Sequence, residues 1–284
     1  MRSGWVRESR RPTGPGGDDL PMARIYALVN QKGGVGKTTT AVNLAAYLAM
    51  LGLRILLVDL DPQANATSSL GINKQTVKGG VYASLIGDSK LNESVLHSPQ
   101  LKLALFPASP ALAGAEIELV NELARETRLR KALAASEPLY DYILIDCPPS
   151  LGLLTLNALA AARGVIIPVQ CEYLALEGLG QLTNSIARVR AALNSHLVIR
   201  GVLMTMFESR TGLSAQVVAE VQKHFPGKVF STIIPRNVRL AEAPSHGLPI
   251  SVYAPGSAGG AAYKALADEL VKGDGVKSDG RSGH

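Results

Sequence analysis

Cysteine, aromatic residues and long apolar segments are all scarce in this sequence. Its 284 residues include only two cysteines, Cys147 and Cys171, too few for a framework of several disulfides. No apolar stretch approaches the roughly 20 residues of a membrane-spanning helix. The polar, Gly/Pro-rich start lacks the pattern of a signal peptide. These absences argue against a disulfide-stabilised secreted domain and a membrane-spanning protein, and they fit a reducing cytoplasm.

Alternating strand-like and helix-like segments run through the chain, without a linker or an internal repeat. Hydrophobic residues make up 46% of the sequence, enough to bury a large core. The apolar runs 143–145 and 165–167 are continuous, which is typical of parallel strands covered by helices on both faces. We therefore expect one α/β domain, with a doubly wound, mainly parallel sheet and helices on both faces.

This domain is expected to span residues 22–272. Residues 1–21 contain Gly14-Pro15-Gly16-Gly17 and no periodic apolar pattern, which predicts a disordered N-terminal extension. Residues 273–284 are expected to form a polar C-terminal tail. Within the domain we expect strands at 24–30, 54–60, 102–106, 141–146, 164–169, 197–205 and 229–234, and helices at 37–51, between 115 and 135, and at 152–162, 176–193, 214–225 and 259–271.

Residues 32–39 read Lys-Gly-Gly-Val-Gly-Lys-Thr-Thr and lie between an apolar strand and a helical stretch. Strand, glycine loop and helix form the context of a phosphate-binding loop. The three glycines let backbone N–H groups converge on phosphate oxygens, and the helix N-terminus adds partial positive charge. Lys37 is placed to reach the β- and γ-phosphates, and the Thr38 hydroxyl to ligate Mg²⁺. The segment therefore predicts a nucleoside triphosphate site.

The loop departs from the ordinary pattern G-x-x-x-x-G-K-[ST], because Gln31 stands at the first glycine position and a second lysine, Lys32, enters. Lys37 already serves the nucleotide of its own chain. Lys32 is then either a solvated loop charge or a group that reaches the nucleotide of a facing subunit. The second reading predicts a nucleotide-dependent dimer.

Acidic residues stand at the ends of two expected strands. Asp61 follows the strand 54–60 at the rim where the γ-phosphate should lie, and a carboxylate there can orient the attacking water and accept its proton. Asp59, two residues earlier, points the same way along an extended chain, and we expect it to support the loop or the Mg²⁺ shell. Asp146 ends the strand 141–146, where it either binds Mg²⁺ or caps a turn.

Four segments, in this order, resemble the motifs of one family. The loop 32–39 resembles the deviant Walker A loop of the ParA/MinD class of P-loop ATPases. Segment 57–65 resembles the second acidic motif of that class, and segment 142–152 its Walker B strand and following switch. Segment 233–247 resembles the late loop of the chromosomal, Soj-like ParA proteins. The similarity covers nearly the whole chain, from about residue 22 to about residue 271.

The resemblance implies a P-loop NTPase fold with ATP and Mg²⁺ as cofactors. It also implies functional roles for individual residues. Asp61 is implied to be the catalytic aspartate, with Lys32 and Lys37 acting on the phosphates. Thr38 and Asp146 are implied to hold the metal. The implied nucleotide-binding residues are Lys32, Gly33, Gly34, Val35, Gly36, Lys37, Thr38 and Thr39, with Pro235 and Asn237 against the adenine.

The charge of the chain points to DNA. Its net charge is +6, and residues 200–239 hold six basic residues against two acidic ones. Charge alone is equally compatible with an ordinary solvated basic face. Soj-like proteins bind DNA without sequence preference through this region, and Arg210 and Arg239 match their DNA-contacting arginines. No helix-turn-helix domain precedes the Walker loop, as in the short chromosomal form.

Two related classes compete with this reading. The nitrogenase iron protein bridges an iron–sulfur cluster with two cysteines from each subunit, but Cys147 and Cys171 here occupy positions that fit small buried thiols. MinD attaches to membranes by a basic amphipathic C-terminal helix. Residues 261–271 hold one lysine and two acids, which favours a helix packed on the domain.

The sequence therefore predicts a chromosome- or plasmid-partitioning ATPase in the cytoplasm, associated with the nucleoid. ATP and Mg²⁺ would join two chains into a homodimer that binds double-stranded DNA non-specifically. Slow hydrolysis, stimulated by a ParB-type partner, would release the DNA, and no membrane binding is expected. The alternative is a MinD-like membrane-cycling positioning ATPase. A third class, a reductase or metal-insertion ATPase, would require bound iron or nickel.

Overall fold

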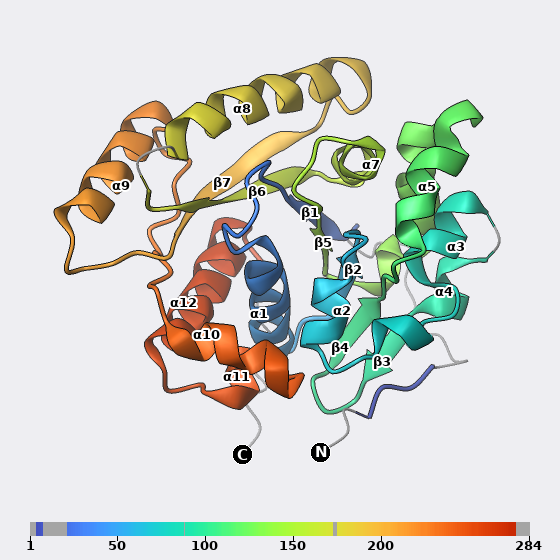
Figure 1. Cartoon of the computed structure of the whole chain (residues 1–284), viewed down its shortest axis with the longest axis horizontal. Helices are drawn as coiled ribbons and strands as arrows, with labels where there is room; N and C mark the ends of the chain where they lie inside the picture. Colours follow the sequence, from blue (N-terminus) through green and yellow to red (C-terminus); the bar gives the residue numbers. More distant parts are fainter. Residues whose placement is uncertain (1–3, 8–21, 88, 173–174, 277–284) are drawn as a thin grey trace.

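The computed structural model describes residues 4–7, 22–87, 89–172 and 175–276. Its seven-stranded sheet has the order β3-β4-β2-β5-β1-β6-β7, and β3 alone among these strands pairs antiparallel. The predicted doubly wound, mainly parallel α/β fold is therefore confirmed (Figure 1). The strands are β1 (Arg24–Leu28), β2 (Ile55–Asp59), β3 (Leu96–Ser98), β4 (Leu103–Phe106), β5 (Tyr142–Asp146), β6 (Gly164–Gln170) and β7 (Val198–Thr205).

Helices cover both faces of the sheet. The α-helices are α1 (Lys37–Met50), α2 (Asn65–Ser69), α3 (Gly80–Ile86), α4 (Leu91–Ser94), α5 (Leu112–Glu118), α6 (Arg128–Ala134), α7 (Leu153–Ala161), α8 (Ala175–Ala192), α9 (Gly212–His224), α10 (Val238–Glu242), α11 (Ile250–Tyr253) and α12 (Ala258–Gly273). Short 3₁₀ helices are η1 (Lys74–Thr76), η2 (Leu119–Asn121), η3 (Arg125–Thr127), η4 (Glu137–Leu139) and η5 (Ala243–His246). Within the described part of the chain, no helix is both long and apolar enough to cross a membrane.

The alternation of side chains along β1 divides the core into two layers. Tyr26 and Leu28 pack with side chains of α1, α2, α11 and α12 on one face. Ile25 and Ala27 pack with side chains of α3, α5, α6, α7, α8 and α9 on the other. In Figure 1, α8 and α9 lie on the opposite side of the sheet from α1 and α12. Because both faces are covered, the central strands are apolar on both sides, as their continuous hydrophobic runs indicated.

The strand predicted at 229–234 does not form. The chain runs beside β7 without forming a ladder: an isolated bridge joins Val229 to Val202, and the N–H of Ile234 donates to the carbonyl oxygen of Met204 at 2.9 Å. A second bridge joins Pro235 to Phe207, just beyond the end of β7. Between them, the backbone N–H groups of Ser231 and Thr232 donate to the carboxylate of Glu269 on α12, at 2.7 and 2.9 Å. Because these N–H groups are bound to Glu269, they cannot donate to carbonyl oxygens of β7, and no regular strand pairing forms here.

The structure also contains elements that the sequence analysis did not predict. The short edge strand β3, the helices α2 to α4, and the helices α10 and α11 were not predicted, and the helical region between 115 and 135 is broken into α5, η2, η3 and α6. All of them are short, and short elements carry too few residues to show a clear hydrophobic period.

The expected N-terminal extension is partly folded. Of residues 1–21, the structure describes 4–7, and the rest of that prediction lies outside the described residues. Val6 pairs with His97 of β3 through two backbone hydrogen bonds of 2.9 Å. The indole Nε1 of Trp5 donates to the carbonyl oxygen of Leu70 at 3.0 Å. This segment therefore covers part of the sheet edge at β3.

The expected polar tail also begins inside the fold. The side chain of Asp274, two residues beyond the predicted boundary, is 5% exposed. Its carboxylate accepts hydrogen bonds from the hydroxyls of Tyr26 and Tyr142, both at 2.9 Å, and from Nε of Arg200 at 2.7 Å. Asp274 thus closes the base of β1, β5 and β7, and the remaining tail, 277–284, lies outside the described residues.

Candidate nucleotide-binding site

The phosphate loop joins the carboxyl end of β1 to the start of α1, at the edge where ligands bind in doubly wound sheets. Gly34 and Gly36 have φ of 74° and 88°, the left-handed region that favours glycine. Gly36 is the N-cap residue of α1 and offers no side chain to the first turn. The N–H groups of that turn are therefore available to an anion.

Contacts with β6 and β7 hold the loop in shape. The backbone N–H of Lys32 donates to Oδ1 of Asn30 at 3.0 Å, and Nδ2 of Asn30 donates to the carbonyl oxygen of Pro168 at 2.7 Å. The hydroxyl of Thr205 donates to the carbonyl oxygen of Val35 at 2.9 Å. The loop is thus tied to its neighbouring strands independently of a bound molecule.

Lys37 points into the loop. Its side chain is buried, and Nζ donates to the backbone carbonyl oxygen of Lys32 at 3.1 Å. Burial lowers the pKa of Lys37, and the carboxylates of Asp146 and Asp61 act in the opposite direction. One ammonium group therefore lies within electrostatic reach of both acidic residues expected at the site.

Asp59 is fully buried and supports the segment that follows β2. Its carboxylate accepts hydrogen bonds from the hydroxyl and the N–H of Thr67, and from the N–H of Asp61 at 3.3 Å. Burial raises the pKa of Asp59 to about 6. These contacts match the supporting role expected from its place in the sequence.

Asp61 lies at the rim of a cavity of about 290 Å³. Its Oδ1 accepts the N–H of Gln63 at 2.8 Å, which orients the carboxylate. Gln63, Asn65 and Met206 also line this cavity and were not predicted to do so, because neither their type nor their spacing marks them. The lining residues are Gly33, Gly34, Gly36, Lys37, Thr38, Thr39, Asp61, Gln63, Asn65, Pro149 and Met206.

Asp146 is buried at the end of β5, and neither carboxylate oxygen has a hydrogen-bond partner among the described residues. Burial, and then the charge of Asp59, raise the pKa of Asp146 well above its ordinary value. The nearby hydroxyl of Thr38 acts in the opposite direction and lowers the pKa of Asp146, although the two groups do not form a hydrogen bond. A buried carboxylate without donors suits a hard divalent cation such as Mg²⁺.

The protein offers such a cation few ligands of its own. Within the described residues, no three or more His, Cys, Asp and Glu side chains gather into a metal cluster. Mg²⁺ at nucleotide sites takes one or two protein ligands and completes its shell with phosphate oxygens and water. Thr38 and Asp146 therefore fit a nucleotide-bound Mg²⁺.

A second cavity, of about 390 Å³, adjoins the first and shares Gly36, Thr39 and Met206 with it. It is lined by Gly36, Thr39, Thr205, Met206, Ile234, Pro235, Arg236, Asn237, Val238, Leu240, Ala241 and Tyr263. Pro235 and Asn237 were expected at the adenine, and both lie here. The hydroxyls of Tyr263 and Thr40 lie 3.1 Å apart, which joins α12 to α1. Sequence reasoning did not identify Tyr263, because α12 reads as an ordinary packed helix.

Besides Asp146, two expected site residues, Val35 and Lys32, line neither cavity. Val35 is buried, and it contributes its carbonyl oxygen to the hydrogen bond from Thr205. The ammonium group of Lys32 lies 2.8 Å from Oε2 of Glu172, with both side chains 46% exposed. Lys32 is therefore engaged within its own chain, through a residue that no sequence motif marks.

Arg210 and Arg239 lie on two neighbouring segments of the chain. Arg210 is exposed between β7 and α9, and Arg239 is on α10, where its guanidinium lies 2.8 Å from Oε2 of Glu242. The bridge between Phe207 and Pro235 joins the two segments.

The other basic residues of 200–239 do not all belong to this surface. Arg200 pairs with Asp274 at the base of the sheet, and Arg236 pairs with Glu208 at 2.5 Å. The local charge read from the sequence therefore overstates the number of free cations on one face.

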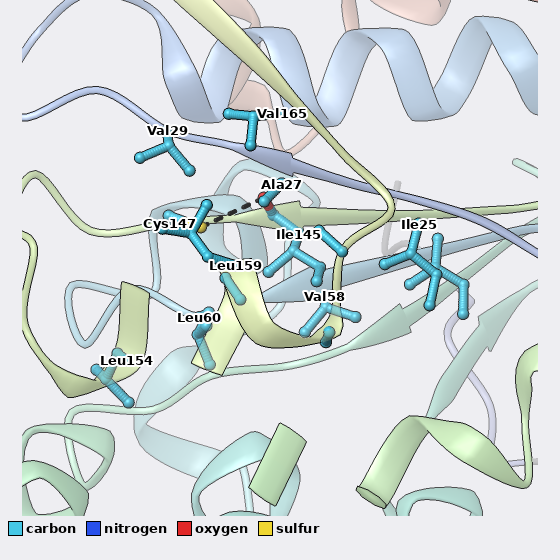
Figure 2. Packing of buried hydrophobic residues seen from close by; sticks show 14 of the residues in the cluster. Ile25, Ala27, Val29, Val58, Leu60, Ile145, Cys147, Leu154, Leu159 and Val165 are labelled. Atoms are coloured by element: carbon cyan, nitrogen blue, oxygen red, sulfur yellow. Dashed lines mark hydrogen bonds between the residues drawn. The ribbon is translucent and has the colours of Figure 1, made fainter. Parts of the chain in front are cut away.

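The cysteines are buried thiols. Figure 2 shows Cys147 among Ala27, Ile145 and Leu159, with its Sγ donating to the carbonyl oxygen of Ile145 at 3.7 Å. Burial raises the pKa of Cys147 well above its ordinary value, and raises that of Cys171 to about 11. Cys147, the residue that follows β5, thus packs on the side of the sheet that faces α7.

Comparisons with known proteins agree with this geometry. Residues 23–199 match the family described as an AAA domain. The chain is 57% identical over 250 residues to the sporulation initiation inhibitor protein Soj of Bacillus subtilis, covering 88% of this chain and 99% of that protein. It is 55% identical over 261 residues to the chromosome partitioning protein ParA of Myxococcus xanthus, covering 92% of each.

A solved structure shares the fold. A protein from Mycobacterium smegmatis, described as cobyrinic acid a,c-diamide synthase with bound ATP analog and magnesium, superposes with a TM-score of 0.78 at 39% identity. The match covers 88% of this chain and 95% of that one. The similarity in fold therefore extends over most of the chain.

Proposed function

This chain belongs to the Soj/ParA family of chromosome-partitioning P-loop ATPases, and we propose that it works as an ATP-dependent homodimer on double-stranded DNA. It is an ATP hydrolase whose cofactors are ATP and Mg²⁺. Two chains, each with ATP and Mg²⁺, associate face to face and bind nucleoid DNA without sequence preference in the cytoplasm. Hydrolysis is slow, and a ParB-type partner stimulates it and so releases the DNA.

The observation that carries this proposal is the meeting of Lys37, Asp61 and Asp146 at one edge of the sheet. Phosphoryl transfer to water needs charge compensation and an oriented nucleophile. Lys37 supplies positive charge at the phosphates, and Asp61 orients the water and accepts its proton. Thr38 and Asp146 fit the metal, whose chemistry when bound is to neutralise charge on the phosphate oxygens.

The surroundings of Gly33 support a face-to-face dimer. A side chain added at Gly33 would meet no atom within 4 Å, so the single chain has room for one. The adjacent Lys32 side chain is half exposed. A glycine that its own chain does not require, lining the cavity next to a half-exposed lysine, fits close approach by a second subunit.

The placement of the arginines supports DNA binding. Arg210 lies on the loop after β7 and Arg239 on α10, and the Phe207–Pro235 bridge joins the segments that lead to them, so the two arginines can approach a common ligand from neighbouring positions. A dimer would present two copies of each. Contacts of this kind bind phosphates and carry no base readout.

The MinD-like alternative is less supported. Tyr263, Leu266 and Leu270 of α12 are fully or almost fully buried against the domain, together with residues of α1. A membrane-binding amphipathic helix needs its apolar face free to enter the lipid. The apolar face of α12 is already used inside the protein.

The test is co-sedimentation of the protein with DNA and, separately, with vesicles of anionic lipid, each with ATP, ADP or no nucleotide. We expect ATP-dependent binding to DNA and no nucleotide-dependent binding to vesicles. Binding to vesicles without binding to DNA would replace the proposal by the MinD-like function. Iron or nickel recovered in stoichiometric amounts would indicate the reductase or metal-insertion class.

A further inference from the structure

Glu172 lies two residues beyond the end of β6, and its carboxylate faces the phosphate loop. Oε2 accepts a hydrogen bond from Nζ of Lys32 at 2.8 Å, and Oε1 accepts one from Nε2 of Gln170. The pair joins residues 140 positions apart in the chain. Gln170 thus orients the carboxylate, while Lys32 neutralises it.

The backbone on both sides of this ion pair is fixed. The N–H of Lys32 is bound by Asn30, and its carbonyl oxygen accepts Nζ of Lys37. Asn30 is in turn bound to Pro168 of β6, the strand that leads to Glu172. The pairing of β1 with β6 therefore sets the distance between the two backbones, and the ion pair opens by movement of its half-exposed side chains.

An ammonium group held by Glu172 in its own chain cannot at the same time lie on the phosphates of a facing subunit. We infer that Glu172 is a positioning residue that holds Lys32 within the single chain, and that ATP-dependent dimerisation breaks this ion pair. The inference rests on the proposed function, which gives Lys32 its role across the dimer interface. Glu172 then sets how readily the lysine leaves, without touching the nucleotide itself.

The effect is expected to be moderate. Both side chains are 46% exposed, so solvent screens the pair and limits its strength. A symmetric dimer breaks two such pairs. Removing the acceptor in both subunits should tighten dimerisation by about two- to thirtyfold, the range that exposed ion pairs allow.

The experiment compares dimer dissociation constants at saturating ATP and Mg²⁺ by analytical ultracentrifugation, with Asp61→Ala present throughout to block hydrolysis. Glu172→Gln keeps the shape of the side chain and removes its charge. Glu220→Gln is the matched control, since it removes the acceptor of an exposed ion pair with Lys223 on α9, far along the chain from the loop. We expect tighter dimerisation for Glu172→Gln, no change for Glu220→Gln, and unchanged ATP binding by the monomer in both.

The salt dependence of dimerisation distinguishes the proposed role of Glu172, holding Lys32 by charge, from a purely structural role. The advantage of Glu172→Gln over the parent should shrink as salt rises, because salt already weakens the Lys32–Glu172 pair in the parent. In a Lys32→Ala background, Glu172→Gln should give no gain. Dimerisation of Glu172→Gln that equals or falls below that of the parent would overturn the inference.

Failure of the proposed function gives a different pattern. If Lys32→Ala alone dimerises as well as the parent, Lys32 has no role across the interface and the proposed dimer mechanism is wrong. If Lys32→Ala abolishes dimerisation while Glu172→Gln changes nothing, the dimer mechanism stands and only the role of Glu172 is wrong.

Discussion

The hydroxyl of Thr67 donates a 2.6 Å hydrogen bond to Oδ2 of Asp59, and the backbone N–H of Thr67 donates to the same oxygen at 2.8 Å. The Thr67 hydroxyl also accepts the N–H of Ala108 at 3.0 Å. Thr67 lies on α2, just after the segment that carries Asp61. One buried hydroxyl therefore fixes the segment that carries Asp61 between the ends of β2 and β4.

We expect Thr67→Val to lower the free energy of unfolding by about 1–3 kcal/mol, because Asp59 loses a donor and the N–H of Ala108 loses its acceptor in a buried site. Thr67→Ser keeps the hydroxyl and is the matched control. Urea unfolding of the nucleotide-free protein measures both. Equal stability of the two variants would show that the hydroxyl does not hold this segment.

Asp61→Ala should retain ATP binding and lose turnover by about 10²- to 10⁴-fold, the usual contribution of a positioned general base. Lys37→Ala is the contrasting variant. It should lose productive nucleotide binding, because the phosphate charge loses its main partner. Steady-state phosphate release and equilibrium binding of ATP separate the two effects. Turnover of Asp61→Ala at the parent rate would remove Asp61 from the reaction.

Arg210→Ala and Arg239→Ala should weaken the ATP-bound protein on every DNA sequence alike and leave basal hydrolysis and dimerisation intact. Removing one arginine–phosphate interaction should flatten the slope of log affinity against log salt by roughly one unit. The measurement is a salt titration on two unrelated duplexes. Arg130→Ala, which replaces an exposed arginine on α6, is the control. Unchanged affinity in both variants would move the DNA site elsewhere.

Both cysteines should react slowly with an alkylating reagent in the native protein. With the pKa of Cys171 raised to about 11, its thiol stays protonated at pH 8, and labelling should be about a hundredfold slower than in urea. The rate should rise as the pH approaches that value, and Cys147 should react more slowly still. Mass spectrometry of native and unfolded samples measures this. Rapid native labelling would mean open thiols of the kind that a bridging cluster requires.

Trp5 is the only tryptophan of the chain, so its fluorescence reports whether the segment 4–7 is docked. Val6→Pro removes the N–H that donates to His97, and we expect a red shift of the emission and a loss of about 0.5–1.5 kcal/mol in the free energy of unfolding. Val6→Ile keeps the donor and should behave like the parent. Identical emission from both variants would contradict docking in solution.

Local patterns were sufficient for the centre of the fold and for the phosphate site. The glycine loop, Asp61 and Asp146 each stand directly beside a buried strand, and the carboxyl ends of parallel strands lie at one edge, so the sequence alone predicts their convergence. Pro235 and Asn237 line the cavity that adjoins the phosphate loop, and their contact with adenine stays a prediction. The roles of these residues in binding and hydrolysis stay predictions.

The features that the sequence did not predict depend on interactions between residues that are far apart in the chain. Glu269 takes the donors of Ser231 and Thr232, and this prevents the strand that their apolar neighbours favour. Lys32 finds its acceptor 140 residues away, at Glu172. Neither partner stands in a pattern that links it to the other, because hydrophobic periodicity describes burial and does not identify pairs of polar groups.

Asp274 has a consequence for the order in which this protein can fold. Its bonds to Tyr26 and Tyr142 span 248 and 132 residues of sequence. Contacts so distant form late, since the chain must close a long loop before they stabilise anything. Synthesis proceeds at roughly 5–20 residues per second, so Asp274 is added about 10–50 s after β1 has been made. The phosphate loop follows β1 directly, so it emerges early and spends that interval attached to an unfinished sheet.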